Sequence, residues 1–364
     1  MEFTLHENFS ELDPTEWNAL LSESISDVPF LRHEYLSAWW TTRGGGEWPQ
    51  AELALVSARE NDRLIGIAPL FLTELDGQPA LMLLGSIEIS DYLDLIVRAD
   101  DLSRFLAGLL DFLASPARRG PPAPVPQAQA GRADSAQACS PLDWYNLPDD
   151  SPTLAALEAE SAKRGWNFTQ EPFRPSLRVP LPGDFETYLA GIDKKQRHEI
   201  RRKMRRAGES SQNVRWYIVT DESTLDEEAE ACCHLMAQDP AKQVFLTQTM
   251  RTQMKAMIQA AFKAGWLQLA FMEVDGQKVA TYLNFDYGNR IWVYNSGLDF
   301  SFRDLSPGWA LLGYLLQWAN ENGRRAFDFM RGDEDYKYKF GALRWEVMLV
   351  RVESQSKNRR LWRP

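Results

Sequence analysis

The residues with the clearest chemical potential lie near the end of the chain, where a predicted helix start precedes a cluster of ionisable side chains. Ser306, Pro307 and Gly308 open a run of apolar residues at helical spacing. Ser suits the position before a helix and Pro the first position, so we predict a helix that ends near Gly323. The unpaired amides of its first turn and the helix dipole favour an anion, and Gly308 would let a ligand approach the backbone. We therefore predict a pyrophosphate site here, against the alternative of an ordinary capped helix.

The ionisable cluster follows a short predicted strand at 326–329. Its members are Asp328, Arg331, Asp333, Glu334, Asp335, Tyr336 and Lys337. Asp328 alternates with two phenylalanines, so it faces away from them, and a carboxylate in that position needs a partner such as Lys337 or Arg331. Two interpretations remain open: Asp328 is a catalytic base, or it forms a structural ion pair that fixes the strand to the next loop.

The elements that must position these residues follow the order hairpin, strand, helix, strand. We predict strands at 267–274, 277–285 and 290–296 before the helix, and the strand at 326–329 after it. The first half shows a similar order, with strands at 52–58, 64–72, 80–84 and 92–97, a helix at 102–114 and a strand at 142–147. Flanking helices are predicted at 15–23, 34–41, 151–165, 184–192, 225–236 and 247–264. The pattern indicates a degenerate internal repeat, based on element order and not on identity.

Three segments carry a family resemblance: Pro29-Phe30 with Ala38-Trp39-Trp40, the basic run 194–206, and the final motif SPG…FDFMRGDEDYKYKFG. Together they resemble the GNAT acyltransferase superfamily, in the branch of the CelD-like acetyltransferases and the Fem peptidyltransferases. The resemblance implies an α/β (α+β) fold of two GNAT-like units, each a mixed, mostly antiparallel twisted sheet flanked by helices. We expect residues 1–150 to form one half and 151–364 the other, with the acyl-donor site in the second. An insertion at about 116–141, rich in Ala, Pro and Gln, is expected to be mobile.

The resemblance also implies where an acyl-CoA donor would bind. In GNAT-like proteins the pantetheine arm lies along a splayed strand, here 290–296, and the pyrophosphate lies at a helix start. The residues expected to bind the donor are Tyr294, Ser296, Ser306, Pro307, Gly308 and Trp309. The usual phosphate loop, Gln/Arg-x-x-Gly-x-Gly/Ala, is replaced by Ser-Pro-Gly-Trp. The motif residues Asp328, Gly332, Tyr336 and Lys337 carry over with it, and we take Asp328, Glu334, Tyr336 and Lys337 as the candidate catalytic groups.

A dense basic run, Lys194–Arg206, stands out in an acidic chain and is predicted to be helical. The candidate anion-binding residues are Arg197, His198, Arg201, Arg205 and, from the later motif, Arg331. The run is either a solvated helix face or a contact for a polyanion. The candidate polyanions are the phosphates of CoA, an acidic glycan or lipid-linked precursor, and tRNA.

Composition limits the function classes. The chain has 364 residues, 44% of them hydrophobic, which is enough for two folded domains. A net charge of −11 argues against a protein that binds duplex DNA. The sequence contains no apolar run long enough to span a membrane and begins without an apolar secretory segment, so we expect a cytoplasmic location. Three Cys and four His show no zinc spacing, and we predict no metal site.

We therefore predict an acyl-CoA-dependent N-acyltransferase that transfers an acetyl group to the amine of a sugar, amino acid or peptide-like precursor, in envelope or exopolysaccharide biosynthesis. Two alternatives stay open. One is a Fem-like peptidyltransferase that uses aminoacyl-tRNA, which the absence of a long heptad insertion disfavours. The other is a catalytically silent GNAT-fold binding module. Trp39, Trp40, Trp292 and Trp309 either line the acceptor pocket or pack in the core.

Overall fold

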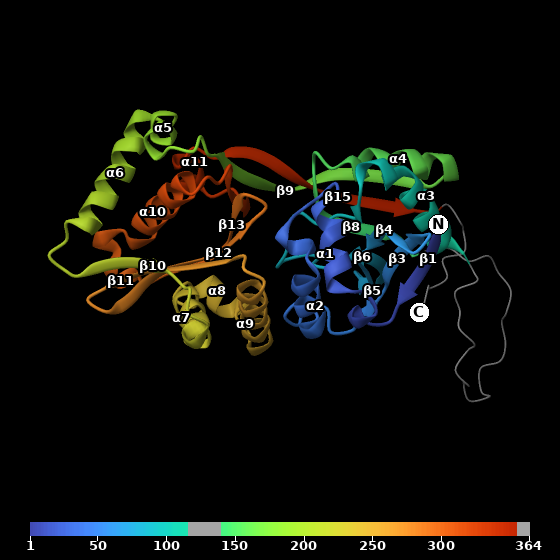
Figure 1. The fold of residues 1–364 in the computed structure, drawn as a ribbon, viewed down its shortest axis with the longest axis horizontal. Coiled ribbons are helices and arrows are strands. Elements are labelled where there is room, and N and C mark those ends of the chain that lie inside the picture. The colour runs from blue at the N-terminus through green and yellow to red at the C-terminus, as the bar shows by residue number, and fades with distance from the viewer. Residues whose placement is uncertain (116–139, 355–364) are drawn as a thin grey trace. The chain divides into compact units, whose positions relative to one another are not determined.

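The computed structural model describes residues 1–115 and 140–354, and the chain divides into two compact units. Unit 1 contains residues 1–36, 48–173 and 347 onward, and unit 2 contains residues 37–47 and 174–346. Each unit has a mixed, mostly antiparallel sheet flanked by helices, which confirms the predicted fold class (Figure 1). The predicted mobile insertion lies outside the described residues, apart from its last two.

Unit 2 is built on a sheet in the order β10-β11-β12-β13-β14-β9. Its strands are β10 (Val214–Ile218), β11 (Leu267–Val274), β12 (Gln277–Tyr287), β13 (Arg290–Leu298), β14 (Ala326–Arg331) and the end of β9 (Asn167–Pro180). Its helices are α5 (Phe185–Ala190), α6 (Lys194–Gly208), α7 (Leu225–Met236), α8 (Pro240–Phe245), α9 (Gln248–Lys263), α10 (Pro307–Glu321) and α11 (Asp335–Lys339). All pairs are antiparallel except β13 with β14, which are parallel and joined through α10.

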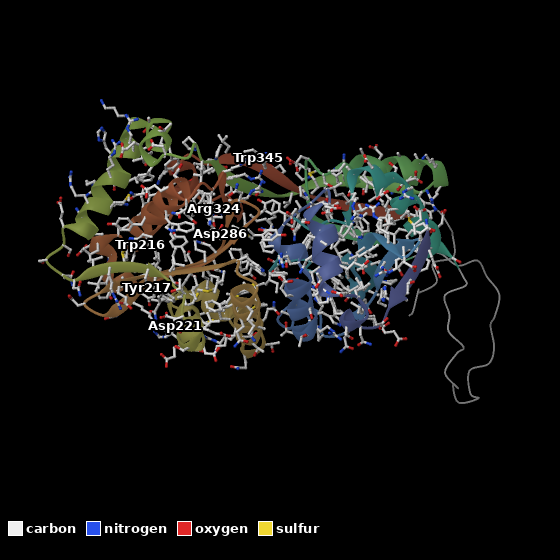
Figure 2. All side chains as sticks on the ribbon, viewed as in Figure 1. Trp216, Tyr217, Asp221, Asp286, Arg324 and Trp345 are labelled. Atoms are coloured by element: carbon white, nitrogen blue, oxygen red, sulfur yellow. The ribbon has the colours of Figure 1, made fainter. Side chains whose placement is uncertain are left out.

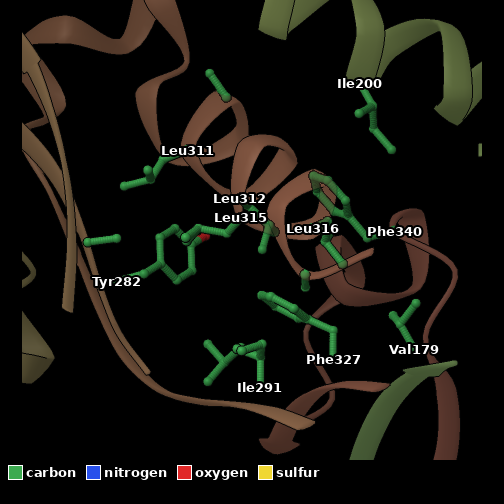
Figure 3. Packing of buried hydrophobic residues seen from close by; sticks show 14 of the residues in the cluster. Val179, Ile200, Tyr282, Ile291, Leu311, Leu312, Leu315, Leu316, Phe327 and Phe340 are labelled. Carbon is green, nitrogen blue, oxygen red and sulfur yellow. The ribbon is translucent and has the colours of Figure 1, made fainter. Parts of the chain in front are cut away.

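Helix α10 is the central element of the unit 2 core. It carries leucines on several sides because one side packs on β12 and β13 while α5 and α6 cover another. Figure 3 shows Leu311, Leu312, Leu315 and Leu316 of this helix among Tyr282, Ile291, Phe327 and Phe340. Burial of so many large side chains stabilises the position of α10 against the sheet. An ion pair holds its far end, where Arg324 donates two hydrogen bonds to Asp286 of β12 (Figure 2).

Unit 1 contains a four-stranded sheet in the order β1-β3-β4-β7 and a second group in the order β15-β8-β6-β5-β2. The strands are β1 (Glu2–His6), β2 (Glu52–Leu53), β3 (Leu55–Glu60), β4 (Arg63–Ala68), β5 (Leu70–Leu75), β6 (Gln78–Leu83), β7 (Ile96–Val97), β8 (Leu142–Pro148) and β15 (Leu343–Glu353). The helices are α1 (Pro14–Ser22), the first part of α2 (His33–Thr42), α3 (Leu102–Ala114) and α4 (Pro152–Arg164). Within residues 1–115 and 140–354, no helix is both long and apolar enough to cross a bilayer.

Most predicted elements are confirmed, and three are corrected. Helix α7 has the predicted bounds, and α4 has the predicted cap residues, Ser151 and Gly165. The single strand predicted at 52–58 is wrong, because β2 and β3 are separate strands in different sheets. The single strand predicted at 64–72 is wrong, because β4 and β5 are separate strands in different sheets with Pro69 between them. Proline has no amide to donate to a ladder, so it suits a break between strands. The strand predicted at 92–97 is reduced to Ile96–Val97.

Candidate functional site

The candidate site begins where β13 and β14 separate. The two strands pair only between Arg290–Trp292 and Ala326–Asp328, although β13 continues to Leu298. A bulge on β13 follows, since Val293 and Asn295 pair with adjacent residues of β12 and Tyr294 is the extra residue. Residues 294–296 are only half-buried. The opened edge therefore leaves a stretch of β13 backbone beside the start of α10, as the resemblance implied.

The start of α10 lacks a side-chain cap. Ser306 occupies the position before the helix, but it is in the left-handed region, at φ 50° and ψ 53°, and its hydroxyl faces the carbonyl of Arg303 at 3.4 Å. No described side chain caps the helix; the amides of Trp309 and Ala310 bond to the carbonyl of Ser306. The predicted helix start is confirmed, and its first turn keeps the dipole character that attracts anions.

Pro307 and Gly308 have a packing role at this start. Both are buried, and a Cβ added at Gly308 would lie 2.6 Å from Leu298 of β13. Gly308 therefore permits α10 to pack closely against β13. The side chain of Leu298 fills the space beside this glycine, where the sequence suggested that a ligand could approach. The Gly308 carbonyl also accepts a hydrogen bond from the Tyr282 hydroxyl at 3.4 Å.

Two cations of α6 lie beside the start of α10. The ammonium of Lys203 lies 3.7 Å from the centroid of the half-buried Trp309 ring, and that ring packs on Phe340. Arg206 donates to the carbonyl of Asp304, two residues before Ser306, at 2.8 Å. Positive charge next to an uncapped helix start strengthens the attraction for an anion. The sequence did not single out these two members of the basic run.

The residues that the sequence did select on α6 have other contacts. Arg197 donates to the last carbonyls of α5, and Arg201 pairs with Glu186. Arg205 lies 3.8 Å from Glu209, and His198 is exposed. Arg197 and Arg201 therefore join α6 to α5, whereas an exposed basic surface remains along the outer side of the helix. The pattern of charges could not reveal this, because it does not show which carboxylates and carbonyls lie opposite.

Asp328 is fully buried at the last pair between β13 and β14. One carboxylate oxygen accepts from Arg178 of β9 at 2.8 Å and lies 3.5 Å from Arg290 of β13. The other accepts from the amide of Met330 at 2.9 Å. Arg178 also lies over the ring of Trp345, at 5.0 Å from its centroid. Both oxygens are engaged, so the contacts favour the structural ion pair over the catalytic base.

Lys337 is buried and fixes the loop after β14. Its ammonium donates to the carbonyls of Phe329, Arg331 and Gly332 at 3.2, 2.9 and 3.3 Å, and lies 2.8 Å from Glu334. Gly332 has φ 116°, and a Cβ there would collide with the Glu334 carboxylate. The loop conformation thus depends on this glycine and on the lysine. Of the ionisable motif, Glu334 remains more than half exposed.

Tyr336 lies in the short helix α11. Its ring packs edge-on against Phe329. Burial raises the pKa of Tyr336 well above its usual range, and the nearby Glu334 carboxylate raises it further. Tyr336 is therefore protonated at neutral pH and is suited to donate a proton or a hydrogen bond.

A partly buried lysine outside every predicted motif also reaches this region. Lys242 of α8 donates to the carbonyl of Ser296 at 2.5 Å, on the part of β13 beyond its pairing with β14. Burial lowers the pKa of Lys242. Nothing in the local sequence distinguishes it from a surface lysine, because the segment around it indicates only a short helix capped by Asp239.

The four candidate tryptophans divide between core and surface. Trp39 and Trp292 are fully or almost fully buried, which favours the interpretation that they pack in the core. Trp40 is half-buried with Arg43 stacked 3.5 Å from its ring, and Trp309 is half-buried below Lys203. Only Trp309 therefore combines partial exposure with a place at the start of α10.

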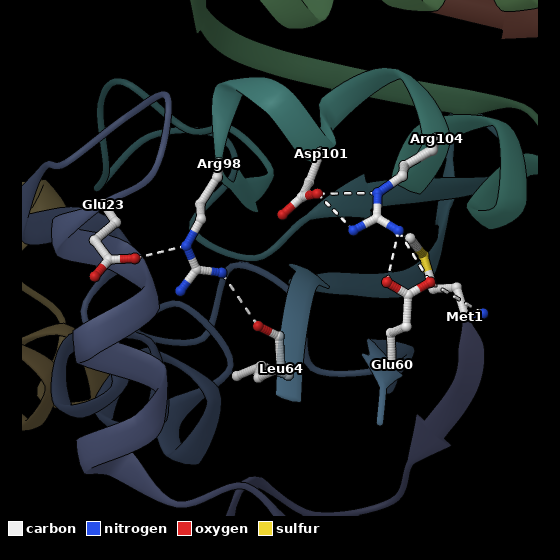
Figure 4. A network of polar contacts seen from close by, with 7 residues as sticks. All are labelled: Met1, Glu23, Glu60, Leu64, Arg98, Asp101 and Arg104. Carbon is white, nitrogen blue, oxygen red and sulfur yellow. Dashed lines mark hydrogen bonds and ion pairs between the residues drawn. The ribbon is translucent and has the colours of Figure 1, made fainter. Parts of the chain in front are cut away.

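The corresponding helix start in unit 1 has the opposite charge. Asp100 and Asp101 precede α3, and Arg104 binds both Asp101 and Glu60 (Figure 4). The start of α3 therefore has two carboxylates and an ion-paired arginine, whereas the start of α10 is uncapped and has two cations beside it. An anionic ligand is disfavoured at α3.

The strand opening in unit 1 is also occupied by the chain itself. Strand β6 pairs in parallel with β8 at Leu81 and Leu142 only, as β13 does briefly with β14. The following segment, 89–97, is buried, and the Leu93 amide donates to the Asn146 carbonyl of β8 at 2.9 Å. Unit 2 is thus the unit whose opening remains accessible. Among the described residues, no three His, Cys, Asp or Glu side chains are grouped as a metal site would require.

In comparisons with known proteins, the segment that matches a family model lies in unit 2. Residues 194–338, from the start of α6 to α11, match the family model described as an acetyltransferase (GNAT) domain. No curated protein matches the chain in sequence.

Similar solved structures include FemX, at 13% identity and a TM-score of 0.63 over 96% of this chain and 97% of that chain. A conserved protein of unknown function from Bacteroides thetaiotaomicron is 12% identical, with a TM-score of 0.59 over 97% and 100% of the two chains. L-PGS from Bacillus licheniformis is 13% identical, with a TM-score of 0.52 over 95% and 93%. At these identities the likeness is one of fold. Residues 194–338 therefore match the acetyltransferase (GNAT) domain model, in a chain whose fold is similar to that of FemX.

Proposed function

We propose that the protein is an acyl-CoA-dependent N-acyltransferase, with acetyl as the expected acyl group. The acceptor is the amine of a sugar, amino acid or peptide-like precursor, as the family resemblance implies. The observation that carries the proposal is the uncapped start of α10 beside the opened edge of β13, with Lys203 and Arg206 next to it. All of these residues lie in the segment that matches the GNAT model.

The donor would be held by contacts of two kinds. The first turn of α10 and the two cations suit a pyrophosphate, because backbone amides and positive side chains together favour phosphate oxygens. The half-buried stretch of β13 beyond its pairing with β14 is the expected path of the pantetheine arm, as the resemblance implies. Bound CoA would supply the thioester that the acceptor amine attacks.

The ionisable residues of the motif then take separate roles. Glu334 is the candidate base for the proton of the acceptor ammonium; of the three exposed carboxylates of the motif, Asp333, Glu334 and Asp335, it is the one paired with the buried Lys337. Tyr336, which stays protonated, is the candidate hydrogen-bond donor to the departing thiolate. Asp328 and Lys337 hold the strand end and the loop that carry these two groups.

A second candidate is a Fem-like transferase that uses aminoacyl-tRNA in place of acyl-CoA. The exposed basic surface of α6 favours it, because Lys194, Lys195 and His198 face solvent and a polyanion binds to such a surface through its phosphates. The third candidate is a GNAT-fold module that binds a phosphorylated ligand without turnover. The setting in envelope or exopolysaccharide biosynthesis and the cytoplasmic location remain predictions.

Calorimetric titration with CoA and acetyl-CoA tests the proposal, with free thiol release from acetyl-CoA in the presence of amines as the activity assay. Wild type should bind both, and Lys203→Met with Arg206→Gln should weaken both by a similar factor. Gly308→Glu is unsuitable, since Leu298 leaves no room for its side chain. Binding of aminoacyl-tRNA but not of CoA would establish the second candidate. CoA binding without turnover on a broad panel of sugar, amino acid and peptide amines would indicate the silent module.

A further inference from the structure

We propose that Lys242 donates a hydrogen bond to the acyl carbonyl oxygen of the bound donor and stabilises the negative charge that develops there. This inference rests on the proposed function. Lys242 lies outside the ionisable motif that follows β14, and the position of its ammonium is the first observation that supports this role.

Lys242 is held at the opened edge by its own helix and by β13. The Asp239 carboxylate accepts from the amides of Ala241 and Lys242 at 2.8 and 3.3 Å, which fixes the first turn of α8. The side chain then reaches the carbonyl of Ser296 at 2.5 Å. Ser296 lies four residues beyond the last β13 pair with β14, at Trp292. The ammonium therefore bonds to β13 beyond its pairing with β14, where β12 is the one paired strand among the described residues.

The ammonium of Lys242 can donate further hydrogen bonds, in contrast to the Ser296 amide and the ammonium of Lys337. An ammonium has three N–H donors, and in the described part of the chain the Ser296 carbonyl is the one acceptor bonded to this one. The Ser296 amide is engaged by the side chain of Asn295 at 2.9 Å. Lys337, the buried lysine of the region, donates to three carbonyls. Of the two lysines and the Ser296 amide, Lys242 is therefore the group with N–H donors left for a ligand.

The surrounding charges suit a cationic donor. Burial opposes the charged form of Lys242, and the carboxylates of Asp239 and Glu334 partly offset that effect. Glu334 belongs to the loop after β14 and is the candidate base of the site. The candidate base would therefore act from the loop after β14, and the hydrogen-bond donor from α8, which Lys242 joins to β13.

The chemical step that this contact assists is attack on the thioester. The amine nitrogen forms a bond to the carbonyl carbon, and the carbonyl electron pair moves onto oxygen. That pair returns as the C–S bond breaks, the amine gives up its proton to the base, and the sulfur leaves as a thiolate. Lys242 keeps its proton throughout, and its N–H donors bind the oxyanion more strongly than the neutral carbonyl, which is the condition for catalysis.

The test compares CoA with carboxymethyl-CoA, in which an anionic carboxylate replaces the acetyl group. Wild type should bind carboxymethyl-CoA at least about tenfold more tightly than CoA, because a hydrogen bond to a charged group adds at least a factor of that size. Lys242→Met should remove this difference and leave CoA affinity within about twofold. Lys242→Arg should recover part of the difference. The matched control is Lys255→Met, which removes another partly buried, ion-paired lysine of unit 2 and should preserve the difference.

Each outcome has a distinct meaning. Equal loss of CoA and carboxymethyl-CoA affinity in Lys242→Met, together with a lower Tm, would show that the lysine only fastens α8 to β13 and would overturn the inference. A preference for carboxymethyl-CoA that survives in Lys242→Met would overturn it as well, and so would the absence of any preference in wild type that binds CoA. Failure of wild type to bind either ligand would instead refute the CoA-dependent function on which the inference rests.

Discussion

Ser306→Asp tests the start of α10 as the site of the donor diphosphate. Asp tolerates the left-handed conformation of Ser306 better than most residues, so the substitution should not disturb the backbone. Its carboxylate would lie at the uncapped amides and stabilise the helix by about 0.3–1 kcal/mol. The same carboxylate would repel a diphosphate. At about 4 Å, repulsion between two unit charges is about 1 kcal/mol in water and about 4 kcal/mol near a protein surface.

This range corresponds to a rise in the Kd for CoA of about fivefold to several hundredfold, with an unchanged or higher Tm. Calorimetry and thermal unfolding measure the two quantities on the same sample. The control is Ser103→Asp, which adds a carboxylate to the first turn of α3 in unit 1 and should leave CoA affinity unchanged. An unchanged Kd in Ser306→Asp, or an equal loss in Ser103→Asp, would refute the assignment of the diphosphate to α10.

Three further variants address the framework. Asp328→Asn should destabilise the protein by about 3 kcal/mol in urea unfolding, because it leaves Arg178 without its charged partner; loss of turnover with unchanged stability would restore Asp328 as a catalytic group. Burial raises the pKa of Asp94 to about 6, so the folded state retains a proton that the unfolded chain releases near pH 4, and stability should fall by about 2–3 kcal/mol as pH rises from 4 to 7. Urea unfolding across that range should show a smaller decline in Asp94→Asn, and an identical decline would contradict this origin. Gly297→Ala should lower the Tm strongly because its Cβ would collide with the backbone of α7, whereas Gly208→Ala, with ordinary space, should change it little.

The sequence predicted the elements of unit 2 around the site because each has a strong local signal. The hairpin of β11 and β12 has an Asp-Gly turn, and α10 has a Ser-Pro start. Strand β9 was missed, since it contains interior prolines at 172 and 175 and several charged residues, and its strand character comes from pairing with β14. Local propensity is a weak guide where distant strands decide the conformation.

The candidate site was predicted only in part, because local sequence signals do not show which distant residues come together. The helix start and the opened strand follow from residues that are adjacent in sequence, and the structure brings them together. The partners of Asp328 come from strands that are distant in sequence, and Lys242 lies 54 residues before the carbonyl it binds. Which of the α6 cations face α10 depends on the packing of two helices, so Lys203 and Arg206 were not identified from the charge pattern.

The paired aspartates ahead of α3 limit the stoichiometry of a tandem protein. If both copies of a duplicated fold kept an anion-attracting helix start, each polypeptide would saturate at two equivalents of cosubstrate. Because carboxylates precede α3 and residues 89–97 fill the strand opening of unit 1, we expect saturation at one equivalent. Unit 1 is then released from selection for cosubstrate binding, and its surface loops can diversify without cost to the reaction.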